Sequence, residues 1–324
     1  MFENKTVLIT GGAGFIGSNL ALYIQNNYPN ARVVVFDRFQ DGSKLDSGNL
    51  ASLGHFKNLE GFRGDIICGD INDPSDLERL GDYSFDYIFH QAAISDTTVK
   101  DQKIVMQTNL NAFKDLMDIA KRDGAKMIYA SSGSVYGKLP SPHTVGTEAP
   151  LNVYGFSKLA MDNYAMGQED VPAVGLRYFN VYGPREYFKG KTASMVLQFG
   201  LQILKGERPR LFEGSDKIKR DFIYVGDVIQ ANLKAAVASK SGVYNVGTGR
   251  ARSFQDIVDI LCDELGIHPE YEYIKNPFVK QYQFFTQADI EPTRRELGFE
   301  PKFSLEEGIR ADIPYIKKIF EEEL

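Results

Sequence analysis

A tyrosine and a lysine four positions apart form the pair of side chains best suited to proton transfer. Tyr154 and Lys158 stand in the stretch NVYGFSK, and this spacing places both on one face of a helix. Because an ammonium stabilises a phenolate, we expect Lys158 to lower the pKa of Tyr154 from about 10. Upstream, Ser132 ends an apolar run, and its hydroxyl could bond the same reacting oxygen, or could simply cap a helix or turn. The set predicts proton exchange with a hydroxyl group.

The N-terminal stretch TGGAGFIG, residues 10–17, has the spacing of a phosphate-binding turn. It follows the apolar run of residues 6–9 and precedes a helical pattern over residues 18–24. Free N–H groups at such a helix start attract the phosphates of a dinucleotide, although glycines also make ordinary turns. A nicotinamide dinucleotide would take hydride from the carbon whose hydroxyl proton Tyr154 removes. Two fingerprints fit at once, Gly12-x-Gly14-x-x-Gly17 and Gly11-x-x-Gly14-x-x-Gly17.

The end of the next apolar run bears on the choice between NADP and NAD. Asp37 stands there, where an acid bonds the ribose hydroxyls of NAD. Arg38 follows at once and Lys44 is near, and these cations would favour the 2′-phosphate of NADP unless they are solvated loop residues. We expect tightly bound NADP, with NAD left open.

Apolar runs that end in polar residues recur along the first half of the chain and must position these groups. They cover residues 33–36, 65–68, 87–89 and 126–129, with helical spacing between them. Continuous apolar strands that alternate with helices are typical of a parallel sheet covered on both faces. We therefore predict an α/β fold with a Rossmann-type doubly wound parallel sheet, and ligands beyond the carboxyl ends of its strands. Residues 101–123 read as one long helix.

The pattern loosens after residue 178, which predicts a smaller C-terminal substrate-binding lobe. We place the dinucleotide-binding domain at 1–178, with returning segments about 222–246. Residues 179–324 would then form mainly the substrate lobe, interleaved with the first domain and containing one helix over 193–204.

Composition excludes several classes of protein. The net charge is −6, and without a long basic run we expect no nucleic acid partner. Cys68 and Cys262 are the two cysteines, which makes a disulfide framework improbable on composition. Strand-forming sequence begins by Lys5 and no apolar run reaches about 20 residues, so we expect a cytoplasmic protein that contacts no membrane. Four scattered histidines have no metal-ligand spacing, and we expect no metal.

These motifs together resemble the extended short-chain dehydrogenase/reductase family nearly from end to end. The resemblance rests on residues 10–17, Asp70-Ile71, residues 90–93, Ser132 and the Tyr154/Lys158 pair. It implies that the dinucleotide is contacted by Gly11, Gly14, Phe15, Ile16, Gly17, Asp37, Arg38, Lys44, Asp70, Ile71, Gln91, Ala92, Ala93, Asn109, Tyr154, Lys158 and Val181.

The second half resembles the ADP-heptose 6-epimerase group of that family, through residues 177–196, 211–228 and 281–290. The resemblance implies epimerisation at C6 of ADP-D-glycero-D-manno-heptose, through a 6-ketone, in lipopolysaccharide inner-core precursor synthesis, and a homo-oligomer. It also implies that Lys189 is a second catalytic acid/base beside Ser132, Tyr154 and Lys158; spacing alone would leave Lys189 a loop lysine or a diphosphate contact. The implied substrate-binding residues are Ser95, Ser132, Asn180, Lys189, Lys191, Gln198, Phe212, Glu213, Gly214, Ser215, Arg220 and Tyr282.

Two details depart from the group, and three other functions compete with epimerisation at C6. Lys191 stands where relatives carry a small polar residue, and Gln198 replaces a histidine. A UDP-hexose 4-epimerase shares the catalytic set. A 4,6-dehydratase would carry an acidic pair after the serine, where this chain has Gly133-Ser134-Val135. A dinucleotide-sensing scaffold would not need both Tyr154 and Lys158.

Overall fold

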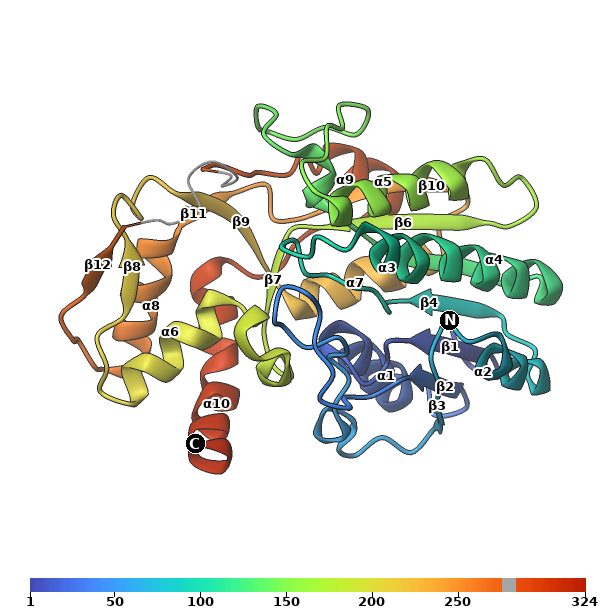
Figure 1. Cartoon of the computed structure of the whole chain (residues 1–324), viewed down its shortest axis with the longest axis horizontal. Helices are drawn as coiled ribbons and strands as arrows, with labels where there is room; N and C mark the ends of the chain where they lie inside the picture. The colour runs from blue at the N-terminus through green and yellow to red at the C-terminus, as the bar shows by residue number, and fades with distance from the viewer. Residues whose placement is uncertain (276–283) are drawn as a thin grey trace.

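Parallel strands form the central sheet in the order β10-β6-β5-β4-β1-β2-β3 (Figure 1). The computed structural model describes residues 1–275 and 284–324. The chain begins with β1, adds β2 and β3 on one side of it, and then crosses to β4 on its other side. The α/β proteins bind ligands at such a reversal of strand order. The strands are β1 (Thr6–Thr10), β2 (Arg32–Asp37), β3 (Asp65–Cys68), β4 (Tyr87–His90), β5 (Lys126–Ser132), β6 (Ala173–Tyr178) and β10 (Gly242–Val246).

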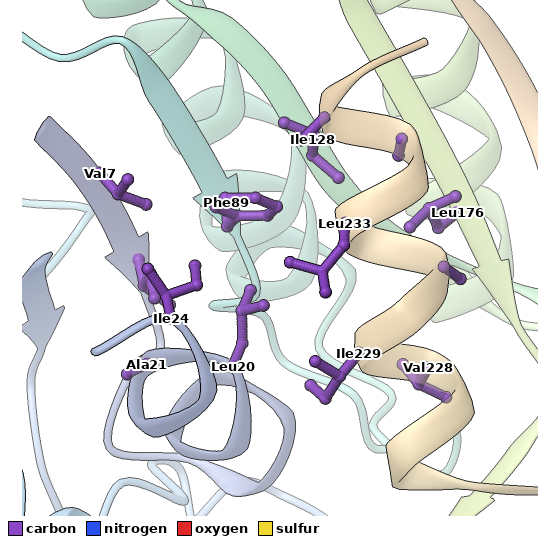
Figure 2. Packing of buried hydrophobic residues seen from close by; sticks show 14 of the residues in the cluster. Val7, Leu20, Ala21, Ile24, Phe89, Ile128, Leu176, Val228, Ile229 and Leu233 are labelled. Carbon is purple, nitrogen blue, oxygen red and sulfur yellow. The ribbon is translucent and has the colours of Figure 1, made fainter. Parts of the chain in front are cut away.

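Helices cover both faces of this sheet, which confirms the predicted fold class. Figure 2 shows one face, where the buried side chains of α1 and α7 point toward the strands. The other face packs on α2, α4 and α5. Each fully buried Leu, Ile or Phe contributes about 1.5–3 kcal/mol through the water it no longer meets. The helices are α1 (Phe15–Asn27), α2 (Pro74–Glu78), α3 (Gln102–Met106), α4 (Ala112–Asp123), α5 (Val153–Met166), α7 (Val225–Ala236) and α9 (Glu291–Leu297), with short turns η1 (Phe56–Leu59), η2 (Arg79–Asp82) and η4 (Gly133–Tyr136).

The helix predicted over residues 101–123 is continuous but not regular. A π-helical turn, η3 (Gln107–Asn111), separates α3 from α4. Such a turn inserts one residue and rotates the next helical segment about its axis, and it often occurs at functional sites. Here it buries Asn109 completely.

A second lobe, seen at the left of Figure 1, packs around its own apolar core. Two small sheets frame it, one in the order β11-β9-β7 and one pairing β12 with β8. Serines cap its helices: Ser194 caps α6, and Ser253 and Ser304 form capping boxes at α8 and α10. Its elements are β7 (Asn180–Tyr182), η5 (Tyr187–Thr192), α6 (Met195–Leu204), β8 (Arg210–Phe212), β9 (Lys219–Tyr224), β11 (Ala251–Ser253), α8 (Phe254–Leu265), β12 (Glu272–Ile274) and α10 (Leu305–Glu323).

The chain crosses between the lobes more often than a simple boundary near residue 178 suggests. Strand β9 belongs to the small sheet, and the return to the large sheet consists of α7 and β10. The segment expected to return, about 222–246, therefore begins in the second lobe. In the described part of the chain, no helix is long and apolar enough to cross a membrane.

Candidate active site

A cavity of about 530 Å³ opens at the carboxyl ends of β1, β2, β4, β5 and β6. Val181 of β7 and Lys189 of η5, both in the second lobe, complete its wall, so both lobes contribute to one site. Its predicted members are Gly11, Gly14, Phe15, Ile16, Gly17, Asp37, Arg38, Asp70, Ile71, Gln91, Ala92, Ala93, Ser95, Ser132, Tyr154, Lys158, Val181 and Lys189.

The glycine turn fits a diphosphate because its backbone lies close to the start of α1. Gly11 has a φ of 66°, and a Cβ on Gly17 would come within 2.2 Å of the Gly11 carbonyl oxygen. Gly14 is the N-cap of α1 without a side-chain cap, and no acid occupies the first turn of this helix. The N–H groups at this helix start are therefore available to an anion.

Asp37 lies beside the glycine turn and stabilises it by accepting hydrogen bonds from the backbone. The N–H of Ala13 donates to Asp37 Oδ2 at 2.9 Å, and the N–H of Phe39 donates to Oδ1 at 2.8 Å. The side chain is 6% exposed, and burial raises its pKa while these hydrogen bonds lower it. The carboxylate is thus already engaged with the backbone, which the strand-end pattern did not reveal.

Arg38 lines the cavity beside Asp37 and forms two loose ion pairs with carboxylates. Its guanidinium lies 3.3 Å from Asp41 and 3.4 Å from Asp70. Both distances are at the loose end for ion pairs, and the side chain is about one third exposed. Lys44, predicted to act with Arg38, is exposed and does not line the cavity.

Ser132 and Tyr154 meet at the end of β5. The N–H of Ser134 donates to Ser132 Oγ at 3.1 Å, so the serine caps η4 as well as facing the site. Burial raises the pKa of Tyr154, and a hydrogen bond with the Ser132 side chain lowers it. The prediction that Lys158 lowers this pKa below its usual value was wrong: loss of water around the phenol outweighs the lowering, which comes from Ser132.

Lys158 is buried, and its Nζ has no hydrogen-bond partner among the described residues. Burial lowers its pKa to about 8, although the carboxylate of Asp162 raises it. Nearby, burial and Lys158 together lower the pKa of His90 to about 3, so this imidazole stays neutral. His90 Nδ1 lies 2.7 Å from Thr10 Oγ1, which ties β4 to β1. An ammonium without a partner beside a cavity suits the hydroxyl groups of a ribose.

Lys189 enters the same cavity from η5. Its Nζ lies 5.1 Å from the centroid of the Phe15 ring, in the glycine turn's own helix. Burial lowers the pKa of Lys189 and the carboxylate of Glu186 raises it. Glu186 accepts the N–H and the hydroxyl proton of Ser194, both at 2.6 Å, which fixes the segment that carries Lys189.

The η5 segment is docked on the dinucleotide half of the molecule. The rings of Phe188 and His55 stack with centroids 3.6 Å apart. Gln40 Nε2 donates to the Phe188 carbonyl oxygen at 2.7 Å. These contacts hold Lys189 over the cavity, and no motif marks His55 or Gln40 because they are distant in sequence.

Asn109 does not line the cavity but supports its wall. Its side-chain amide exchanges two hydrogen bonds with the backbone of Ile94, at 2.9 and 3.0 Å. A third bond, 2.9 Å long, joins Asn109 Nδ2 to Ser157 Oγ on α5. Asn109 therefore fixes the loop carrying Ala93 and Ser95, and its contact with the cofactor stays a prediction.

Most of the remaining predicted substrate residues lie in the second lobe, away from this cavity's lining. Gln198 Nε2 donates to the carbonyl oxygen of Ala193 at 2.6 Å, and Ala193 lies between η5 and α6. Ser215 is buried, and its hydroxyl has no partner among the described residues. Arg220 is buried and lies over the Phe254 ring at 5.8 Å. Asn180, Lys191, Glu213 and Gly214 are exposed, Phe212 is partly buried, and Tyr282 lies outside the described residues.

Several cavity residues carried no sequence signal. They come from the connections after β2 and β3, from α3 and the π turn, and from the end of β6. Their types are common in loops, and only the order of the strands brings them to the site. They are Leu45, Ala51, Ser52, Leu53, Gly54, Asn72, Ile104, Gln107, Thr108, Tyr178 and Phe179.

The model of the NAD dependent epimerase/dehydratase family matches residues 7–247. Among solved structures, ADP-L-glycero-D-manno-heptose-6-epimerase from Helicobacter pylori is 53% identical, with a TM-score of 0.90 over 98% of this chain and 97% of that one. UDP-glucose 4-epimerase from Thermotoga maritima, solved with UDP-glucose, is 29% identical with a TM-score of 0.84 over 97% and 99%. The Thermus thermophilus UDP-glucose 4-epimerase, solved with NAD, is 26% identical with a TM-score of 0.80 over 98% and 100%.

Proposed function

The chain belongs to the NAD dependent epimerase/dehydratase family, and from this membership we propose that it converts ADP-D-glycero-D-manno-heptose to ADP-L-glycero-D-manno-heptose. The reaction inverts C6 through a transient 6-ketone, and its product serves lipopolysaccharide inner-core synthesis. In this proposal the part near 1–178 holds a nicotinamide dinucleotide, and the interleaved second lobe holds the sugar nucleotide. The 53% identity to the Helicobacter pylori enzyme, against 29% or less for the two UDP-glucose 4-epimerases, favours the heptose substrate.

One observation carries the proposal: Lys189 of the second lobe shares a cavity with Tyr154 and Lys158. Inversion of an exocyclic carbon presents the substrate oxygen in two orientations, one before and one after rotation about C5–C6. Two groups that exchange protons, on opposite lobes, can serve one orientation each. A 4-epimerase reaction on the ring does not by itself call for this second group.

In the proposed mechanism, Tyr154 takes the proton of the C6 hydroxyl, and Ser132 holds the same oxygen. The nicotinamide, when bound, accepts a hydride and returns it, so no electrons are lost. The glycine turn and the start of α1 hold the diphosphate, and Lys158 donates to ribose hydroxyls. After rotation, Lys189 donates the proton that the oxygen requires on the opposite face.

We propose NADP as the resident dinucleotide. Asp37 already accepts two backbone N–H groups and is 6% exposed, so it offers little to a free ribose hydroxyl. Arg38 lines the cavity and has loose acid partners. Chromatography of the dinucleotide released by denaturing the purified protein tests this choice. NADP is expected, and Arg38→Ala should lower NADP affinity about tenfold relative to NAD; release of NAD alone would overturn the assignment.

The substrate is tested by mixing the purified protein with ADP-D-glycero-D-manno-heptose without added cofactor. Proton NMR follows the configuration at C6. A stable mixture of the two epimers is the expected result, and it would also report cofactor retention. Absence of conversion, even after NAD and then NADP are added, together with conversion of UDP-glucose to UDP-galactose, would replace the proposal with a hexose 4-epimerase.

A further inference from the structure

We propose that Asp162 is a positioning residue that keeps Lys158 in its charged form, and that Arg177 holds Asp162 in the place this requires. The inference rests on the proposed function only through the role of Lys158 toward the dinucleotide. It concerns a group of charges beneath the cavity that neither the motifs nor the proposed mechanism use.

The geometry begins on helix α5. Asp162 follows Lys158 by one turn, so the two side chains lie on one face of the helix. Both residues are 2% exposed or less. Asp162 Oδ2 accepts from Arg177 Nε at 2.9 Å and from Ser131 Oγ at 3.0 Å. By hydrogen-bond geometry, Asp162 Oδ1 and Lys158 Nζ have no partner among the described residues. Burial raises the pKa of Asp162, and the charge of Arg177, with hydrogen bonds that include one with Tyr129, lowers it. One carboxylate oxygen is anchored, while the other retains its capacity to stabilise a cation.

Arg177 is the centre of the group and holds two carboxylates. Its Nη1 lies 2.5 Å from Glu148 Oε1, and the same nitrogen donates to the Tyr136 hydroxyl at 2.9 Å. Tyr136 in turn donates to Asn245 Oδ1 at 2.6 Å. With Lys158 charged, the group contains two positive and two negative side chains. Buried charges persist when they are balanced and hydrogen-bonded, and removal of one leaves the others uncompensated.

Among the groups around Lys158, Asp162 carries the negative charge that acts on its pKa. The carboxylate raises the pKa of Lys158 against burial, which lowers it to about 8. The other carboxylate, Glu148, pairs with Nη1 of the guanidinium, whereas Asp162 pairs with Nε, and Asp162 is the carboxylate that raises the pKa of Lys158. Other titratable groups lie on α5, on the elements packed against it and around the cavity. They include Tyr154 and Tyr164 on α5, His90 on β4, Lys126 and Tyr129 on β5, Tyr136 on η4, Arg177 and Tyr178 on β6, the exposed Lys103 on α3, and Asp37 and Lys189 in the cavity lining.

The charge of Lys158 matters because only the ammonium can donate several hydrogen bonds to ribose hydroxyls. When the proton is lost, the hold on the dinucleotide weakens. Removing the carboxylate of Asp162 should lower the pKa of Lys158, so dinucleotide binding should weaken at a lower pH. Removing Glu148, which shares Arg177 but does not act on Lys158, should leave that pH in place.

The test measures how fast the bound dinucleotide leaves the purified protein between pH 6 and 10, in an excess of competing dinucleotide. Lys158→Met identifies the part of the pH dependence that belongs to Lys158, because this variant should lack it. Asp162→Asn is compared with the matched control Glu148→Gln. We expect the midpoint for Asp162→Asn to fall by about 0.5–1 pH unit. Asp162→Glu keeps the negative charge, so its midpoint should lie close to that of the unaltered protein.

Two results would overturn the proposal. An unchanged midpoint in Asp162→Asn would show that the carboxylate does not control Lys158. Equal shifts in Asp162→Asn and Glu148→Gln would assign both acids a purely structural role around Arg177. If Asp162→Asn does not fold, Asp162→Ser removes the same carboxylate and keeps Arg177 paired with Glu148. The same fall in midpoint is expected there, and its absence would count against the proposal equally.

This measurement needs no sugar nucleotide, so it separates the two proposals. A protein that converts no ADP-heptose but shows the predicted midpoints would contradict the proposed function and support the role of Asp162. A protein that converts ADP-heptose with no change of midpoint in Asp162→Asn would support the function and refute the role of Asp162.

Discussion

Lys189 Nζ lies 5.1 Å from the centroid of the Phe15 ring, so a lysine of one lobe is held over the helix that begins the dinucleotide site of the other. A cation over an aromatic ring is stabilised at this distance, and both side chains line the same cavity. The contact explains how a lysine on an irregular segment can serve as a positioned acid. It also gives Lys189 a place in the site that does not depend on any bound molecule.

Lys189→Gln is expected to lower the epimerisation kcat about 100-fold or more, because the variant cannot donate the proton after rotation of the substrate. Bound dinucleotide should remain near one per chain, measured by absorbance after denaturation. Lys205→Gln is the matched control, since Lys205 is an exposed lysine of the same lobe that does not line the cavity. Equal kcat values for the two variants would remove Lys189 from the mechanism.

Ser132→Ala should shift the pH dependence of kcat/KM to higher pH. The hydrogen bond with Ser132 lowers the pKa of Tyr154, which burial raises. Without it the phenol holds its proton to higher pH, and the base form that takes the substrate proton appears later. Tyr154→Phe has no proton to exchange and should lose activity at every pH. A Ser132→Ala profile that merely falls in height, with its rising limb unmoved, would contradict this account.

Loss of the Lys158 proton should also lower the activity of the unaltered protein as pH rises through about 8. The folded-state pKa of Lys158 is about 8, below the usual value for lysine, because burial disfavours the charge. The charged form therefore dominates below this pH and is lost above it. A kcat/KM that stays level to pH 10 would argue against a charged Lys158 in the reacting enzyme.

The sequence predicted the features that arise from local spacing. Apolar runs and helical periods identified the large sheet and its helices, and the glycine turn and the Tyr154/Lys158 pair were recognisable within a few residues. The second lobe was harder, because strands such as β7 and β9 are short and pair with distant segments. Their partners depend on how the chain folds back, which no local period records.

The candidate site also combines features that the sequence predicts with contacts that it does not. The strand-end position of Asp37 was visible in the sequence, but its bond to Ala13 depends on the turn's conformation. The pairing of Asp162 with Arg177 joins helix α5 to strand β6, on which the helix packs. Long-range polar contacts of this kind follow from tertiary packing, and a single sequence carries no period or motif for them.

Gly17→Ala should disrupt the dinucleotide site, because the added Cβ would come within 2.2 Å of the Gly11 carbonyl oxygen. We expect the purified variant to carry little or no dinucleotide, measured by absorbance after denaturation. Gly167→Ala is the matched control, since its Cβ would lie an ordinary 3.5 Å from the Tyr164 oxygen. Full cofactor content in Gly17→Ala would show that the turn can open without loss of binding.

Arg177→Met should lower the free energy of unfolding by about 3–5 kcal/mol, measured by urea denaturation. The variant leaves the buried carboxylate of Asp162 and the partly buried one of Glu148 without their shared cation. Arg294→Met is the matched control: Arg294 also pairs with two carboxylates, but all three side chains are exposed by a third or more. Exposed pairs contribute about 0–1 kcal/mol, since water and salt screen them. Similar losses in the two variants would mean that the Arg177 group acts like a surface pair, and burial would then not be what makes its charge balance matter.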